Sequence, residues 1–204
     1  MMMKDLGTRV ATVWEGLRPV TKKLIVGALE SGTAAPAQSR KFFYDAHADW
    51  EVSRLLTALD EQSSTPSVRK NATKLNEIEA LANTCVLVLE EQTASAEVFI
   101  QLATRAIKDN DYNRLDKLSD RLAERFSAGE IAEIVRQTEL PQIRAIAYET
   151  LAMLPIPVIM PLLDDPLYAG IAAGALEQKA YEFDSDEARD LLDQFDAENQ
   201  IIDE

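Results

Sequence analysis

The chain has little of the residues on which the chemistry of many small proteins depends. Its 204 residues include one cysteine, Cys85, and one histidine, His47. A single cysteine cannot form an intrachain disulfide or build a thiolate zinc site, which excludes disulfide-rich secreted domains and zinc fingers. A reducing compartment is the simplest expectation. Because Cys85 lies in an apolar stretch, we expect a buried structural thiol there.

Long hydrophobic runs are also missing. The longest apolar run, residues 154–163, has ten residues, three of them proline. A membrane-spanning helix needs about 18 apolar residues or more, so we expect no transmembrane segment. The N-terminus lacks the basic region followed by an apolar core that a secretory signal requires, and we therefore expect a cytoplasmic protein.

Glycine is scarce, and none occurs between Gly32 and Gly129. A sheet protein needs glycine at many of its turns, whereas helices joined by short polar turns do not. Alanine and leucine, with 28 and 24 residues, make up about a quarter of the chain, and both favour helices. The sequence therefore predicts an all-α fold, and it offers no glycine-rich phosphate loop.

Acidic residues outnumber basic ones, and the net charge is −14. Residues 1–50 hold seven basic and five acidic groups, whereas residues 177–204 hold eleven acidic and two basic groups. Such an acidic segment repels the phosphates of nucleic acids, so we expect no nucleic-acid partner.

Apolar residues spaced three and four apart predict a chain of helices. The expected ranges are 4–17, 19–30, a helix ending near 61, 67–92 (one helix or two), 95–109, 112–126, 128–138, 141–153, 157–164, 167–182 and 185–196. Residues 31–39 predict a flexible connection, and residues 62–66 a break. We expect an N-terminal helical portion, 1–62, and a helical-repeat portion, 67–204. The alternative is one continuous domain. Two segments match the capping box, Ser127 with Glu130 and Asp184 with Glu187.

A repeat is visible in the second half of the chain. Helix starts near 128, 141, 157, 167 and 185 place alternate starts 29, 26 and 28 residues apart. Helical pairs that recur at such a period are typical of an α-solenoid, in which each pair buries its apolar faces against its neighbours. The sequence therefore predicts antiparallel helical pairs stacked as a short superhelix.

The residues of this repeat resemble a known family. Pro141–Ala147, with its Ile143-Arg144 pair, is followed by Leu151, a second helix and Asp164-Asp165-Pro166. This order, mainly over residues 141–182, resembles short bacterial HEAT-like repeats, and Pro66–Ala72 shares its opening. Ala169-Gly170 stands where the second repeat should have an apolar-arginine pair. The resemblance implies a curved protein-binding scaffold, and it supplies no catalytic residues.

Two segments have the residue types of a metal or catalytic site. His47 lies between Asp45 and Asp49, but residues two apart on a helix point about 200° from each other, so the three do not share a face. Residues 109–120 begin like a calcium loop, but Arg114 replaces the required glycine, which favours a helix-helix turn capped by Asp111. We therefore expect no catalytic residue, no metal and no cofactor.

A basic amphipathic segment near the N-terminus is the candidate contact with a partner. It combines Trp14 with Arg18, Lys22 and Lys23. The alternatives are that Trp14 belongs to the core, or that this segment attaches to an anionic membrane surface. The function expected from the sequence is a non-enzymatic protein–protein interaction scaffold or adaptor. The alternative is a helical-bundle enzyme or small-ligand-binding protein with a dispersed pocket.

Overall fold

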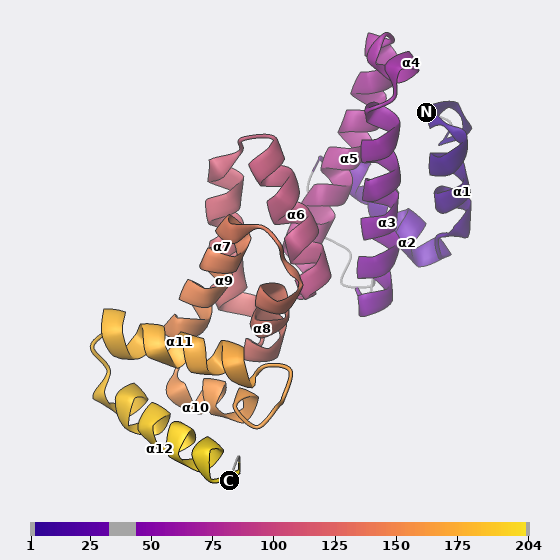
Figure 1. Cartoon of the computed structure of the whole chain (residues 1–204). Coiled ribbons are helices and arrows are strands. Elements are labelled where there is room, and N and C mark those ends of the chain that lie inside the picture. Colours follow the sequence, from indigo (N-terminus) through magenta and orange to yellow (C-terminus); the bar gives the residue numbers. More distant parts are fainter. Residues whose placement is uncertain (1–2, 33–43, 203–204) are drawn as a thin grey trace. The chain divides into compact units, whose positions relative to one another are not determined.

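The computed structural model describes residues 3–32 and 44–202, and all the regular structure assigned there is helical. This result confirms the all-α class. The chain divides into two compact units, Met1–Thr93 and Ala94–Glu204, each with its own buried core (Figure 1). Within the described ranges, no helix combines the length and the apolar composition that crossing a membrane requires.

The first unit is built on two long helices, α3 (Ala46–Ser63) and α5 (Ala72–Gln92), which pack side by side. Helix α1 (Thr8–Gly16) packs on α3, and α2 (Pro19–Ser31) contacts both long helices. The 3-10 turn η1 (Met3–Leu6) and the short α4 (Pro66–Arg69) complete the unit. Its largest fully buried side chains are aliphatic: Leu6, Ile25, Leu55, Leu56, Leu59, Ile78, Leu81 and Leu89. Cys85, a residue of α5, is buried, as expected.

The first expected helix, 4–17, is interrupted at Gly7. This residue has a φ of 136°, a conformation that side chains disfavour, and it separates η1 from α1. A Cβ atom at position 7 would also lie 2.6 Å from the end of the Gln62 side chain of α3, which would have to move. Leu6, Val10 and Leu17 are buried, whereas Trp14 is only half-buried.

The boundary between the two units differs from the one expected at residues 62–67. The chain does break there, but α4 and α5 pack against α3, and Val68 is buried. The first unit therefore continues to Thr93. The range 67–92 forms two helices because Asn71 begins a new one, its side chain accepting a hydrogen bond from the Lys74 N–H (3.1 Å). The expected connection at 31–39 lies mostly outside the described residues, which resume at Tyr44.

The second unit consists of shorter helices joined by short turns. Their bounds are α6 (Ala96–Lys108), α7 (Tyr112–Arg125), α8 (Ala128–Gln137), α9 (Pro141–Met153), α10 (Ile156–Ile159), η2 (Met160–Leu162), α11 (Ala169–Glu182) and α12 (Asp186–Ile202). Each lies within a few residues of its expected range, although α12 is longer. Asp111 caps α7, accepting from the Arg114 N–H (3.1 Å), which confirms the helix-helix turn.

Contacts in the second unit join helices that follow one another and helices that are next but one. Helix α6 contacts α7 and α8, α7 contacts α9, and α9 contacts α8 and α11. At the start of α6, the Ala96 N–H donates to the carboxylate of Glu130, in the first turn of α8 (2.7 Å). Lys179, near the end of α11, donates to the carbonyls of Ala152 and Leu154, at the end of α9 (2.9 and 3.0 Å). The start of α6 therefore lies beside the start of α8, and the end of α11 lies beside the end of α9.

One predicted capping box is half correct, and the other, Asp184 with Glu187, is wrong. The Ser127 hydroxyl accepts from the Glu130 N–H (3.2 Å), but the Glu130 carboxylate binds Ala96 instead of reaching back to Ser127. At α12, the cap is Ser185, which accepts from the Ala188 N–H (3.3 Å), whereas Asp184 pairs with Arg189 (2.5 Å). In both places the local pattern predicts a capping role for a side chain that instead makes a tertiary or loop contact.

Candidate functional site

The residues expected to contact a partner have different environments. Trp14 is half-buried on α1, and Lys23 is exposed on α2. Lys22 is half-buried and donates to the Glu15 carbonyl (3.0 Å). Arg18 is bound within the first unit by carboxylates of α3 and its N-cap. The structure thus draws Arg18 into an internal polar network and leaves Lys23 facing solvent.

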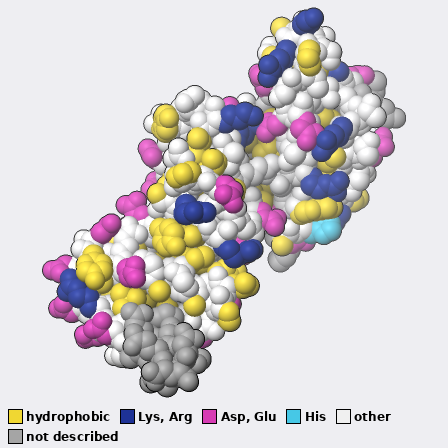
Figure 2. All heavy atoms as spheres, viewed as in Figure 1, with side chains coloured by type: hydrophobic (Ala, Val, Ile, Leu, Met, Phe, Trp, Pro, Cys, Tyr) yellow, Lys and Arg dark blue, Asp and Glu magenta, His cyan; other side chains and the backbone are white. Residues whose placement is uncertain are grey.

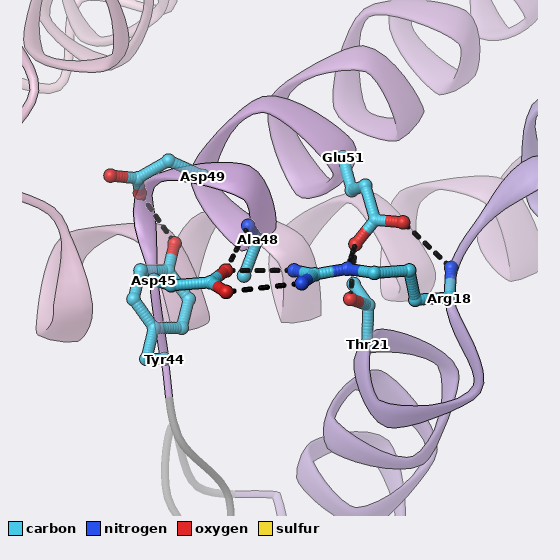
Figure 3. A network of polar contacts seen from close by, with 7 residues as sticks. All are labelled: Arg18, Thr21, Tyr44, Asp45, Ala48, Asp49 and Glu51. Atoms are coloured by element: carbon cyan, nitrogen blue, oxygen red, sulfur yellow. Dashed lines mark hydrogen bonds and ion pairs between the residues drawn. The ribbon is translucent and has the colours of Figure 1, made fainter.

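Arg18 joins the start of α2 to the start of α3 (Figure 3). Its Nη1 and Nη2 atoms donate to the two oxygens of Asp45 (3.0 and 2.7 Å). Its Nε and its backbone N–H donate to the two oxygens of Glu51 (2.9 and 2.6 Å), and the Thr21 hydroxyl donates to Glu51 as well. We call these four residues, Arg18, Thr21, Asp45 and Glu51, the Arg18 clasp.

Local structure positions both ends of the clasp. Pro19 opens α2, where the missing N–H of proline costs nothing, so Arg18 is the N-cap. Asp45 is the N-cap of α3 and also accepts from the Ala48 N–H (2.8 Å). Glu51 lies on the buried stripe of α3, between Ala48 and Leu55. An ionised carboxylate on such a stripe is stabilised by a cationic partner, and Arg18 supplies it.

The electrostatics of the clasp keep it ionised. The Arg18 guanidinium and the Ala48 N–H hold the pKa of Asp45 well below its usual range. Burial alone would raise the pKa of Glu51, but hydrogen bonds from Thr21 and Arg18 lower it overall. The pKa of Arg18 is raised by Asp45 and Glu51 in turn. Carboxylates with lowered pKa values accept protons poorly, so the clasp is suited to joining helices rather than to acid-base catalysis.

A second buried carboxylate, Asp49, has the opposite environment. It is 8% exposed and accepts from the Tyr44 hydroxyl (2.5 Å) and from the Thr93 side chain. Burial raises the pKa of Asp49, despite these two hydrogen bonds, because no cation faces it among its named partners. Burial and the contact with Asp49 also raise the pKa of Tyr44.

His47 takes no part in a metal site with its two aspartates. His47 is exposed, and its ring lies edge-on to the Trp50 ring, with centroids 5.6 Å apart. The Arg54 guanidinium lies over the Trp50 ring, 4.5 Å from its centroid. In the parts of the chain that the structure describes, no group of three or more His, Cys, Asp or Glu side chains could hold a metal ion.

The second unit contains a groove that no sequence pattern predicted. It has a volume of about 690 Å³ and lies between α9 and α11, lined by Ala145, Tyr148, Glu149, Gly174, Glu177, Gln178, Tyr181 and Glu182. We call it the α9–α11 groove. Figure 2 shows hydrophobic side chains at the surface over these helices, with acidic side chains near them.

Two residues of α11, Gly174 and Lys179, affect which side chains line this groove. A Cβ atom at position 174 would lie 3.3 Å from the Tyr148 ring, so glycine lets that ring approach the helix closely. Lys179 is drawn toward the end of α9 by the two carbonyls that it binds, and it is not among the lining residues. The lining therefore carries three carboxylates and no cation.

The sequence held a partial signal for each feature. Glu51 interrupts an apolar stripe, which indicates a buried ion pair, but the pattern did not identify Arg18 as its partner. In α11 the lining residues 174, 177, 178, 181 and 182 are three and four apart and share one face. Only the packing of α11 beside α9 turns that face into a groove.

Low pH should destabilise the first unit and α8, because three carboxylates there have lowered pKa values. The folded-state pKa values of Asp45 and Glu51 lie below their ordinary values of 3.8 and 4.5, and hydrogen bonds, chiefly from Arg136, lower the pKa of Glu133 to about 2. The folded state therefore binds fewer protons than the unfolded state, so the free energy of unfolding should fall as the pH decreases from about 4.5 toward 2.

Urea unfolding followed by circular dichroism across this pH range measures the effect. The Glu133→Gln variant, which has no carboxyl to protonate at that position, should show a shallower loss. Asp49 works in the opposite direction, because its raised pKa favours the folded state as it becomes protonated. A stability that stays constant or rises below pH 4.5 would contradict the prediction.

In comparisons with known proteins, no protein-family model, curated protein or solved structure matches this chain.

Proposed function

We propose that the protein is a non-enzymatic protein–protein interaction scaffold, and that its second unit is a short HEAT-like stack of helical hairpins. The observation that carries this proposal is that next-but-one helices meet at matching ends. Helices α6 and α8 meet at their starts, and α9 and α11 meet at their ends. Stacked hairpins produce such contacts, because each hairpin repeats the directions of the one before it.

The contacts support the same division into hairpins. If α10 and η2 together take the place of one helix, the hairpins are α6/α7, α8/α9 and α10-η2/α11. Their second helices, α7, α9 and α11, then form one layer, in which α9 contacts both neighbours. The starts of the last two hairpins agree with the period of the sequence repeat.

Exposed apolar side chains favour a protein as the partner. Between the end of α9 and the end of α11, six large ones are exposed: Met153, Val158, Met160, Leu167, Tyr181 and Phe183. Large apolar groups that remain in contact with water after folding mark interaction surfaces when they occur together. The proposal retains the cytoplasmic location expected from the sequence.

Affinity capture from a lysate of the source organism, followed by reconstitution with the purified candidate, tests the scaffold. We expect saturable binding, with hydrogen-exchange protection of amides in α7, α9 and α11. Binding without protection in the second unit would contradict the proposed scaffold surface. Charge reversal at Lys22 and Lys23 in the same experiment tests the N-terminal contact that the sequence predicts.

Thermal melting in the presence of a panel of small molecules tests the alternative function. A ligand that binds only the folded state raises the melting temperature. If no protein binds and a small molecule stabilises the chain, the alternative of a ligand-binding protein or enzyme replaces the scaffold.

A further inference from the structure

The α9–α11 groove presents two facing helix stripes. Ala145, Tyr148 and Glu149 come from α9, and the other lining residues come from α11. The groove lies between these two helices and is open to solvent. A volume of about 690 Å³ is within the range of about 300 to 1,000 Å³ found for ligand sites.

The charge of the groove has one sign. Glu149, Glu177 and Glu182 line it, and the nearby Lys179 is bound to carbonyls at the end of α9. Gln178 donates to Glu182 (2.9 Å), which holds that carboxylate on the lining face. The groove therefore attracts cations and repels phosphates.

Two aromatic rings, those of Tyr148 and Tyr181, also line the groove. Tyr148 lies against Gly174, and Tyr181, on the next turns of α11, is 80% exposed. An aromatic face attracts a cation, and a planar guanidinium stacks on it while its N–H groups bind a carboxylate. Tyrosine and glutamate together on one groove thus match arginine better than lysine, which has no planar group.

We propose that the α9–α11 groove binds an arginine-bearing segment of a partner protein. This assignment rests on the proposed scaffold function and specifies the chemistry of its partner. The carboxylates of Glu177 and Glu182 receive the guanidinium N–H groups, and the Tyr181 ring packs on the guanidinium or on its aliphatic stem. The exposed apolar side chains at the ends of α9 and α11 contact the rest of the partner.

Fluorescence anisotropy with a fluorescein-labelled alanine-arginine peptide tests the proposal on the full chain. We expect saturable binding that is weaker for the matched lysine peptide and absent for the glutamate peptide. Tyr181→Ala should weaken binding about fivefold, and Glu177→Gln with Glu182→Gln about tenfold. Tyr181→Phe keeps the ring and should bind as the native chain does.

The matched control removes two charges elsewhere in the same unit. Asp116 and Asp120 are exposed on α7, and the Asp116→Asn/Asp120→Asn variant should change binding less than twofold. Equal weakening by this control and by the groove variants would overturn the proposal, because it would show general attraction to an acidic surface. Absence of peptide binding would overturn it as well, and so would displacement of the peptide by spermine at equal affinity. Circular dichroism melting curves verify that each variant folds.

Failure of this inference is distinguishable from failure of the scaffold. If the peptide does not bind but a purified partner protects α9 and α11 from hydrogen exchange, only the arginine assignment is wrong. If neither the peptide nor any protein binds, the scaffold proposal fails too.

Discussion

Glu51→Gln should lower the free energy of unfolding of the first unit by about 3 kcal/mol. Glu51 is 2% exposed, and both of its oxygens accept from donors: Arg18 through two N–H groups and Thr21 through its hydroxyl. Glutamine has the same shape but presents an NH₂ group in place of one oxygen. A donor would then face a donor in a buried position, and the guanidinium of Arg18 would lose half of its counter-charge.

Asp49→Asn provides the matched comparison on the same helix. Asp49 is also buried, but its named partners are the neutral Tyr44 and Thr93, and burial raises its pKa. An asparagine keeps the acceptor for Tyr44 and removes a charge that burial destabilises. We therefore expect a change within about 1 kcal/mol at neutral pH.

Tryptophan fluorescence in urea measures both variants, because the two tryptophans, Trp14 and Trp50, lie in the first unit. The midpoint should fall for Glu51→Gln and stay nearly constant for Asp49→Asn. Equal destabilisation by both substitutions would show that burial of the position, rather than the clasp, determines the cost.

Phe99→Ala should destabilise the second unit by about 4 kcal/mol. Phe99 is 1% exposed on α6, and its ring meets that of Phe126 edge-on, with centroids 5.7 Å apart and an interplanar angle of 73°. Truncation removes a large buried surface and the aromatic pair, and it leaves a cavity at the start of the helical stack.

Urea unfolding followed by circular dichroism, with hydrogen exchange of amides in α6 to α8, measures this loss. The control is Tyr112→Ala on α7, because Tyr112 is 63% exposed and its truncation should cost less than about 0.5 kcal/mol. A small effect of Phe99→Ala, similar to that of the control, would mean that neighbouring side chains fill the space.

Helix positions were predictable from sequence because apolar spacing, proline and caps act locally. Pro19, Pro66 and Pro141 each open a helix in the structure, and Asp111 caps one. The partners of polar side chains were not predictable in the same way. Glu130 matches a local capping box, yet it binds Ala96, 34 residues away in sequence, because helix packing brings that N–H closer.

In the candidate site, too, the residue types were predictable but their partners were not. The basic character of Arg18 suggested a partner contact, but its carboxylates come from the next helix, which a single sequence does not place. The α9–α11 groove required two helices to be set side by side before its acidic and aromatic residues formed one surface. Charge and periodicity identified the residue types, and tertiary packing determined which of them meet.

The bonds between next-but-one helices also bear on how such a unit changes its length during evolution. Repeat proteins commonly gain or lose whole hairpins. Here, removal of α11 would leave the carbonyls of Ala152 and Leu154 without the ammonium of Lys179, and removal of α8 would leave the Ala96 N–H without Glu130. Loss or insertion of one of these helices would therefore have to supply a substitute for these side chains, which favours a fixed number of helices in this unit.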